Sequence, residues 1–209
     1  MKTFHYNTKL YQFLIKAMEL VTINILWILC SIPIITIGAS TTAKYDVLFR
    51  IFKGEDAHIA RKFFKAFAAN FKQATVITGI LLVLAVVIFL DVRLLSRMDS
   101  SFEILGYVVA FAIGLITLST CSYIFPWISR IDDKLANSIK NCFLISMKHL
   151  PRTCVIVLLN ALPAIILLIS YSLFLYMLVF WVTLGFVLIA YCNAKLIDPI
   201  ICRYFPQGT

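Results

Sequence analysis

Charged residues are scarce in this chain of 209 residues, where they account for 14% of the sequence. Soluble globular domains carry about 25% charged and about 45–50% apolar residues, whereas 62% of this chain is apolar. A water-soluble fold of this size would have to expose large apolar patches, and such patches lead to aggregation. The composition therefore indicates a protein whose solvent is lipid.

Motifs for catalysis and metal binding are also missing. The only histidines are His5, His58 and His149, and none has cysteine or carboxylate partners at metal-ligand spacing. The six cysteines are scattered without a close pair, and glycine-rich phosphate loops and the Gly-x-Ser-x-Gly pattern are absent. The sequence thus predicts no catalytic residue, no cofactor and no metal, and we expect the protein not to be an enzyme.

Cations outnumber anions, with 19 Lys and Arg against 10 Asp and Glu. Nucleic-acid binding would require these cations on one polar face of a folded domain. They lie instead in short segments between apolar runs, where cations mark the cytoplasmic side of a membrane. We therefore expect the lipid bilayer, and not a nucleic acid, to be the partner of this chain.

Uncharged stretches divide the chain into five apolar segments, at approximately 20–40, 74–92, 104–127, 153–170 and 173–193. A helix needs about 20 residues to cross a hydrocarbon core of about 30 Å, and backbone groups in lipid must be bonded internally. The last two segments are uncharged throughout, and we place a tight turn between them near residues 170–172. The sequence predicts one all-α domain over 1–209, a polytopic membrane bundle with about five transmembrane segments.

Two of the connecting segments, 44–72 and 128–152, are basic, whereas 91–103 is slightly acidic. Because short loops rich in Lys and Arg stay inside, we expect the two basic segments to be cytoplasmic and 91–103 to be external. Within the basic segments, apolar side chains recur at helical spacing opposite the cations over 59–72 and 133–149. This pattern predicts two interfacial amphipathic helices.

The first apolar run raises a conflict, because a single crossing would place the basic N-terminus outside. Pro33 removes a backbone donor and Gly38 permits unusual dihedrals, so the helix should be interrupted between them. Non-helical backbone at membrane depth is tolerated where it is buried in protein or lines a wet cavity. We expect a broken or re-entrant element with the N-terminus inside; an ordinary span is the alternative.

Polar residues in the spans and at this interruption are the candidate functional residues: Asn24, Pro33, Thr36, Gly38, Ser40, Thr41 and Asn160. Asn24 and Asn160 could bind a polar solute such as a sugar, although polar residues in spans more often bond neighbouring helices. No ionisable residue lies near a span midpoint, which counts against an ion-coupled transporter.

The stretch LWILCSIPIITIGASTTA over 26–43 resembles the N-terminal signature of the YesL family of bacterial membrane proteins, a domain of unknown function (number 624). The segments 53–55, 63–74 and 148–151, together with Asp91, follow the same family pattern. The resemblance implies a multi-pass protein of the bacterial cytoplasmic membrane and no catalytic residue. Since the interruption is its most distinctive part, we hypothesise that 31–42 forms the functional site.

Family members are typically encoded beside carbohydrate ABC transporter components, and their biochemical role is not established. The resemblance therefore implies an accessory protein for carbohydrate uptake or utilisation that contacts ABC permease subunits. The alternative is a small solute transporter or channel that acts as a homo-oligomer.

Overall fold

The computed structural model describes residues 9–54, 58–96 and 103–204, and within these ranges every regular element is a helix. The predicted all-α class is confirmed. Four described helices are long and apolar enough to cross a membrane: Ile59–Leu95, Ile104–Ile128, Leu150–Ile169 and Leu178–Tyr204. They contain the last four predicted apolar segments except for residues 170 and 173–177.

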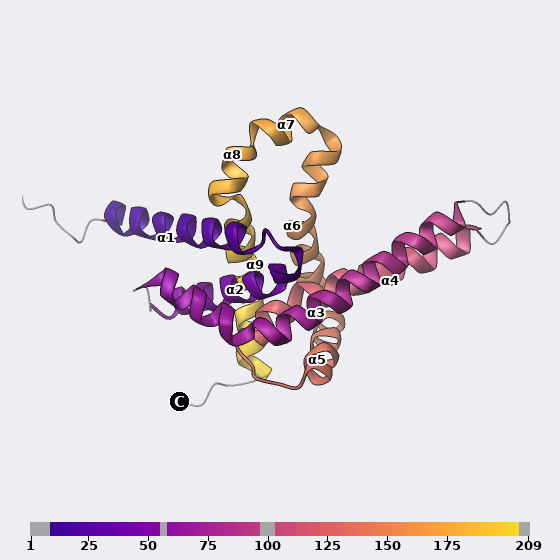
Figure 1. Ribbon diagram of the computed structural model, residues 1–209, viewed down its shortest axis with the longest axis horizontal. Helices are drawn as coiled ribbons and strands as arrows, with labels where there is room; N and C mark the ends of the chain where they lie inside the picture. The colour runs from indigo at the N-terminus through magenta and orange to yellow at the C-terminus, as the bar shows by residue number, and fades with distance from the viewer. Residues whose placement is uncertain (1–8, 55–57, 97–102, 205–209) are drawn as a thin grey trace, which may run out of the picture.

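Two helical hairpins project from a common core and diverge from one another (Figure 1). The first hairpin consists of α3 (Ile59–Leu95) and α4 (Glu103–Ile128). The second consists of α6 (Leu150–Ile169) and α9 (Phe186–Tyr204), with short helical elements at its tip. The arrangement is more open than the predicted bundle, because the hairpins meet at one end only.

The core lies at this junction and is built around α2 (Ile37–Phe52). Ten of the sixteen residues of α2 are buried, and it packs against α1 (Lys9–Cys30), α3, α4 and α9. The spans contribute far less to the core, since at most 39% of the most apolar window in any of the four is buried. Their exposed apolar side chains form the surface that lipid or another membrane protein would cover.

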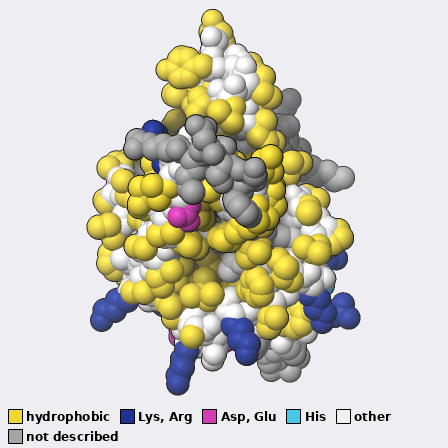
Figure 2. All heavy atoms as spheres, turned by 90° about the vertical axis from the view of Figure 1, so that its right-hand side faces the viewer, with side chains coloured by type: hydrophobic (Ala, Val, Ile, Leu, Met, Phe, Trp, Pro, Cys, Tyr) yellow, Lys and Arg dark blue, Asp and Glu magenta, His cyan; other side chains and the backbone are white. Residues whose placement is uncertain are grey.

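Most Lys and Arg side chains visible on the face shown in Figure 2 lie along its lower edge, while apolar side chains cover the area above. The same end of the molecule carries α5 (Leu135–Lys148) in Figure 1. Cations gathered at one end of a set of spans are typical of the cytoplasmic side. Which side of the membrane this end faces stays a prediction.

The first apolar segment, predicted as one element over 20–40, is divided into two helices. α1 ends at Cys30, and a short 3-10 helix, η1 (Ile34–Thr36), leads into α2. Pro33 stands before η1 with extended backbone (φ −74°, ψ 123°), as expected of a residue that cannot donate a backbone hydrogen bond. The predicted interruption is confirmed, whereas the side of the N-terminus stays a prediction.

α2 ends at a glycine. Gly54 has a left-handed backbone (φ 78°) and its N–H donates to the Ile51 carbonyl over 3.0 Å. Only glycine adopts this conformation without steric cost, and it is the usual way in which a helix ends.

The first predicted interfacial helix, 59–72, is not a separate element. It continues into the second apolar segment, and together they form the 37 residues of α3. No glycine or proline lies between Lys62 and Thr78 to end the helix. The second interfacial helix, predicted over 133–149, is confirmed as α5 over 135–148, with Ser138, Cys142, Ile145 and Ser146 buried.

The predicted tight turn near 170–172 is an arch of short helices. α6 ends at Ile169, and Ser170 accepts a hydrogen bond from the Leu173 N–H over 3.2 Å. α7 (Tyr171–Tyr176), α8 (Leu178–Phe180) and a π-helix, η2 (Trp181–Gly185), follow before α9. The predicted last segment, 173–193, therefore differs from the observed helices at both ends. Ser170 initiates a separate short helix at its start, and α9 continues beyond its end to Tyr204.

Candidate functional site

The hydroxyl groups at the interruption bond to their own backbone. Thr36 Oγ1 donates to the carbonyls of Cys30 and Pro33, at 2.6 and 2.7 Å. Ser40 Oγ donates to the Thr36 carbonyl at 3.0 Å, and Thr41 Oγ1 donates to the Ile37 carbonyl at 2.7 Å. The Thr36–Cys30 bond joins the end of α1 to the turn before α2, whereas the Ser40 and Thr41 bonds lie within the first turns of α2.

Gly38 allows α2 to approach α3 closely. A Cβ atom at this position would overlap Thr78 Oγ1 and would lie 2.8 Å from the Ala74 carbonyl oxygen and 2.9 Å from the Phe125 ring. Real side chains do not tolerate such distances to backbone atoms. Pro33 is exposed and Gly38 is buried, so the interruption has an exposed apolar tip and a packed base.

Asn24 satisfies backbone groups of the π-helix η2. Its side chain is fully buried, and Nδ2 donates to the carbonyl oxygens of Trp181 and Val182, at 3.1 and 2.7 Å. A π-helix shifts the regular bonding of its carbonyls, and such elements are frequent at functional sites. Asn24 therefore ties α1 to the tip-side part of the second hairpin.

Asn160 belongs to a different polar cluster. Its Nδ2 donates to Ser122 Oγ on α4 over 3.1 Å, and its Oδ1 accepts from Asn193 Nδ2 on α9 over 2.7 Å. Asn193 is fully buried, whereas Asn160 is exposed. This cluster joins the two hairpins, and among the described residues no hydrogen bond connects it with Asn24. The two asparagines predicted as solute ligands thus lie in separate places.

Lys44 is the functional candidate that sequence reasoning missed, because it was assigned to a cytoplasmic loop. Only 5% of Lys44 is exposed, and its Nζ lies 3.8 Å from the centre of the Trp27 ring. The Trp27 Nε1–H in turn donates to Thr41 Oγ1 over 3.1 Å. Burial lowers the pKa of Lys44 to about 7. Lys44 follows the buried Ser40 by four residues, so both lie on the same face of α2. This spacing could have indicated from the sequence that Lys44 is buried.

Tyr45, beside Lys44 on α2, is also buried, and burial raises the pKa of its hydroxyl to about 12. The Asn193 side chain counteracts part of this rise. Tyr45 therefore remains protonated at physiological pH and borders the cluster around Asn160.

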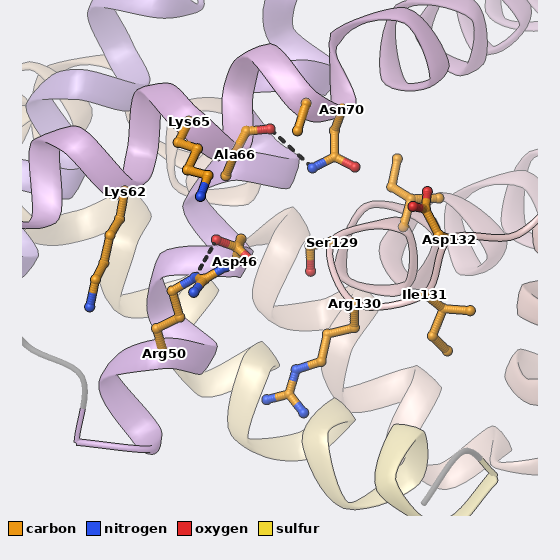
Figure 3. Close-up of a pocket in the computed structure, with 12 residues that line it drawn as sticks. Asp46, Arg50, Lys62, Lys65, Ala66, Asn70, Ser129, Arg130, Ile131 and Asp132 are labelled. Carbon is orange, nitrogen blue, oxygen red and sulfur yellow. Dashed lines mark hydrogen bonds and ion pairs between the residues drawn. The ribbon is translucent and has the colours of Figure 1, made fainter. Parts of the chain in front are cut away.

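A cation-lined depression lies between α2, α3 and the connection from α4 to α5 (Figure 3). Its volume is about 410 Å³, and four of its lining residues are cations: Arg50, Lys62, Lys65 and Arg130. Arg50 pairs with Asp46 over 2.8 Å, so part of this charge is neutralised within the wall. None of the residues predicted for the functional site lines this depression.

Arg130 has a structural role at the edge of the depression. It pairs with Asp198 of α9 over 2.7 Å, and its guanidinium lies 4.1 Å from the centre of the Phe49 ring. Its side chain is 7% exposed. Arg130 thus holds the end of α4, α2 and α9 together.

Within the described part of the chain, no group of three or more His, Cys, Asp or Glu residues could hold a metal ion. The expectation that the protein is not an enzyme stays a prediction. What the described residues provide is a membrane scaffold with polar clusters that join its helices. By fold, the protein is an α-helical multi-pass membrane protein.

The comparisons with known proteins agree with this class. The family described as "Protein of unknown function, DUF624" matches residues 20–92. The chain is also similar to the "Uncharacterized protein YesL" of Bacillus subtilis (strain 168), with 28% identity over 137 residues. That match covers 64% of this chain and 64% of the relative, so a third of the relative's length lies outside it. No solved structure matches.

These findings confirm the resemblance stated from residues 26–43, 53–55 and 63–74: residues 20–92 match the DUF624 family, and the chain is similar to YesL over 64% of its length. The matched family region contains α2, half of α1 and the greater part of α3. It therefore includes the interruption, Asn24 and Lys44, but not Asn160. The family carries no assigned activity.

Proposed function

We propose that the protein is an accessory membrane protein of carbohydrate uptake, which packs the flank of α6 against a partner such as an ABC permease subunit. One observation carries this proposal. Asn160 is exposed on α6, and Ala164, one turn further along the same face of the helix, is exposed and apolar.

An exposed asparagine in a span is unfavourable when lipid covers it, because hydrocarbon offers no hydrogen-bond partner. Asn160 Nδ2 and Oδ1 already bond Ser122 and Asn193, but an amide has two donors and two acceptor sites. A second membrane protein can supply the remaining partners. Polar residues of this kind stabilise contacts between membrane helices by about 0.6 kcal/mol each.

The connection with carbohydrate uptake rests on the family resemblance, since YesL-like proteins are typically encoded beside carbohydrate ABC transporter components. An ABC permease presents membrane helices to its neighbours, and the exposed flank of α6 has the chemistry to pack against them. The rival function is a solute transporter or channel formed by several copies of this chain.

A site-specific photocrosslink in intact cells tests the proposal. A photoreactive residue in place of Ala164 should crosslink to a sugar permease subunit, since Ala164 lies one helical turn from Asn160 on the same face. A photoreactive residue in place of Phe111, which is exposed on α4, serves as the matched control and should give little of this product. Crosslinks from Ala164 only to a second copy of the chain would contradict the accessory role.

A second experiment separates the two functions directly. The purified protein, alone in liposomes, should not increase the uptake of a labelled oligosaccharide. The variant Asn160→Leu should reduce co-purification with the permease, whereas Thr117→Val should not, because the Thr117 hydroxyl is bonded to the Ile113 carbonyl of its own helix. Solute uptake by the protein alone would establish the rival function.

A further inference from the structure

The cation-lined depression is joined to a second depression on α3. The second has a volume of about 510 Å³ and is lined by His58, Arg61, Lys62 and Lys65. Lys62 and Lys65 line both hollows, so the two form one continuous basic surface. We refer to this surface, lined by Arg50, Arg61, Lys62, Lys65 and Arg130, as the basic groove.

The charges of the groove are unequally compensated. Arg50 and Arg130 pair with Asp46 and Asp198. In the described residues Lys65 has no carboxylate partner, and Figure 3 shows it extending from α3 toward the space between α2 and Ser129. A cation such as Lys65 that lines a hollow without a carboxylate partner attracts an anion, and a phosphate group supplies several acceptor oxygens for it.

The inner end of the groove, at Asn70, lies at the depth of the lipid headgroups, and its lysines lie further out. The uncharged part of α3 begins at Gln73, eight residues after Lys65, which is about 12 Å along a helix. Asn70, which also lines the groove, lies only about 5 Å before the same point. The headgroup layer on each side of a bilayer is about 5–8 Å thick, and lysine side chains extend toward it.

A second span places the groove at the same depth. α4 ends at Ile128, and the next residues, Ser129 and Arg130, line the groove. The two spans of one hairpin therefore leave the membrane on either side of it. Beside Lys62 and Lys65, the rings of Phe64 and Phe71 are 51% and 37% exposed, and exposed aromatic rings at this depth contact acyl chains.

We propose that the basic groove binds the phosphate of an anionic phospholipid, with Lys62 and Lys65 as its principal ligands. The exposed Phe64 and Phe71 favour a phospholipid over free phosphate, because they offer acyl chains an apolar surface on a neighbouring flank of α3. Basic hollows between membrane helices on the cytoplasmic side are suited to anionic headgroups. The lipid would brace α2 against the end of the first hairpin.

Native mass spectrometry of the full-length protein, titrated with phosphatidylglycerol and with phosphatidylcholine, tests this proposal. Wild type should prefer phosphatidylglycerol. The double variant Lys62→Gln/Lys65→Gln should bind it about 10- to 30-fold more weakly, given the usual contribution of each cation near a membrane surface. The matched control, Lys134→Gln/Lys140→Gln, removes the same charge from exposed residues that do not line the groove and should retain the affinity.

A charge-retaining variant tests whether the weaker lipid binding of the Gln variant is caused by misfolding. Lys62→Arg/Lys65→Arg should bind phosphatidylglycerol as wild type does, since it keeps both cations. Equal binding of the two lipids by wild type, or equal losses in both Gln variants, would overturn the proposal. Displacement of phosphatidylglycerol by excess inorganic phosphate would overturn the assignment to a lipid and indicate a free phosphate ligand.

Discussion

The ammonium group of Lys44 experiences two opposing effects. The face of the Trp27 ring, 3.8 Å from Nζ, attracts a cation. Burial among α2 and its neighbours disfavours the charged form, because the group loses its hydration. The pKa falls to about 7, so burial is the larger effect. At physiological pH Lys44 is therefore divided between its charged and neutral forms.

This lowered pKa makes stability depend on pH. A lysine in the unfolded chain titrates near pH 10.4, so between about pH 7 and pH 10 the unfolded state binds more protons than the folded state. Stability therefore rises with pH over this range, by on the order of 4 kcal/mol in total. We expect Lys44→Met to be more stable than wild type at pH 7 and to lose most of the rise, as measured by thermal unfolding in detergent at pH 7 and 9.5. Parallel pH profiles for both proteins would contradict this.

Asn24 should be important for stability because its amide serves two backbone carbonyls in the core. Asn24→Leu keeps the size of the side chain but leaves both carbonyls without this donor, which costs about 1–3 kcal/mol. Thermal unfolding should show the loss. Thr22→Val is the control on the same helix, since the Thr22 hydroxyl bonds only the exposed Met18 carbonyl and its removal should change stability by less than about 0.5 kcal/mol.

At the scale of elements, the packing of α2 against α3 depends on one close approach. Gly38→Ala would place a Cβ against the Ala74 carbonyl oxygen of α3, and such overpacking costs about 1–3 kcal/mol. Gly114→Ala, in open space on α4, should instead be neutral or stabilising, because alanine is the better helix former. Thermal unfolding of both variants checks the contrast, and equal stability would show that α2 can move away from α3.

The contact between Gly38 and α3 also determines how a functional role of residues 31–42 can be tested. Because Gly38→Ala disturbs packing, a loss of function in that variant would not separate a functional role from a structural one. Pro33 is exposed, so Pro33→Ala changes the tip of the interruption without filling a contact. Growth on the relevant glycan with Pro33→Ala at wild-type level would contradict a functional role for the tip.

Helix boundaries follow from the sequence where a breaker stands and are missed where none does. Pro33 marked the interruption after α1, and Ser170 marked the end of α6. The junction between the interfacial and spanning parts of α3 has no such residue, so a change from amphipathic to apolar pattern was taken for two elements. The π-helix η2 left no signal, since Trp181–Gly185 is apolar except for Thr183 and its bonding partner, Asn24, lies 157 residues away.

At the scale of the whole molecule, orientation can be measured by labelling. With the native cysteines replaced, we expect an impermeant maleimide to label Tyr176→Cys on intact cells, because Tyr176 lies on the arch of the second hairpin and is exposed. Lys140→Cys on α5 should be labelled only after cell lysis. Labelling at Thr3→Cys, outside the described residues, then distinguishes a single crossing of the first element from a re-entrant one. Labelling of Lys140→Cys on intact cells would reverse the topology.

The long-range contacts of the molecule could not be predicted from the sequence. Composition and charge predicted the class and the apolar segments that lie in the helices of the two hairpins, since lipid constrains each helix separately. The burial of Lys44, the cluster of Asn160 with Ser122 and Asn193, and the basic groove all depend on how distant helices meet. No local pattern encodes these meetings, and so a lysine near a loop was taken for a surface cation.

The unbroken course of α3 gives the molecule a mechanical property. One rigid rod runs from the basic groove to the far end of the first hairpin, and the distance from Lys65 to Leu95 is about 45 Å. A tilt of about 10° at the groove would displace the far end by about 8 Å, by the geometry of a straight helix. A small tilt of α3 at the groove is thus amplified along the helix into a larger displacement at the far end of the first hairpin.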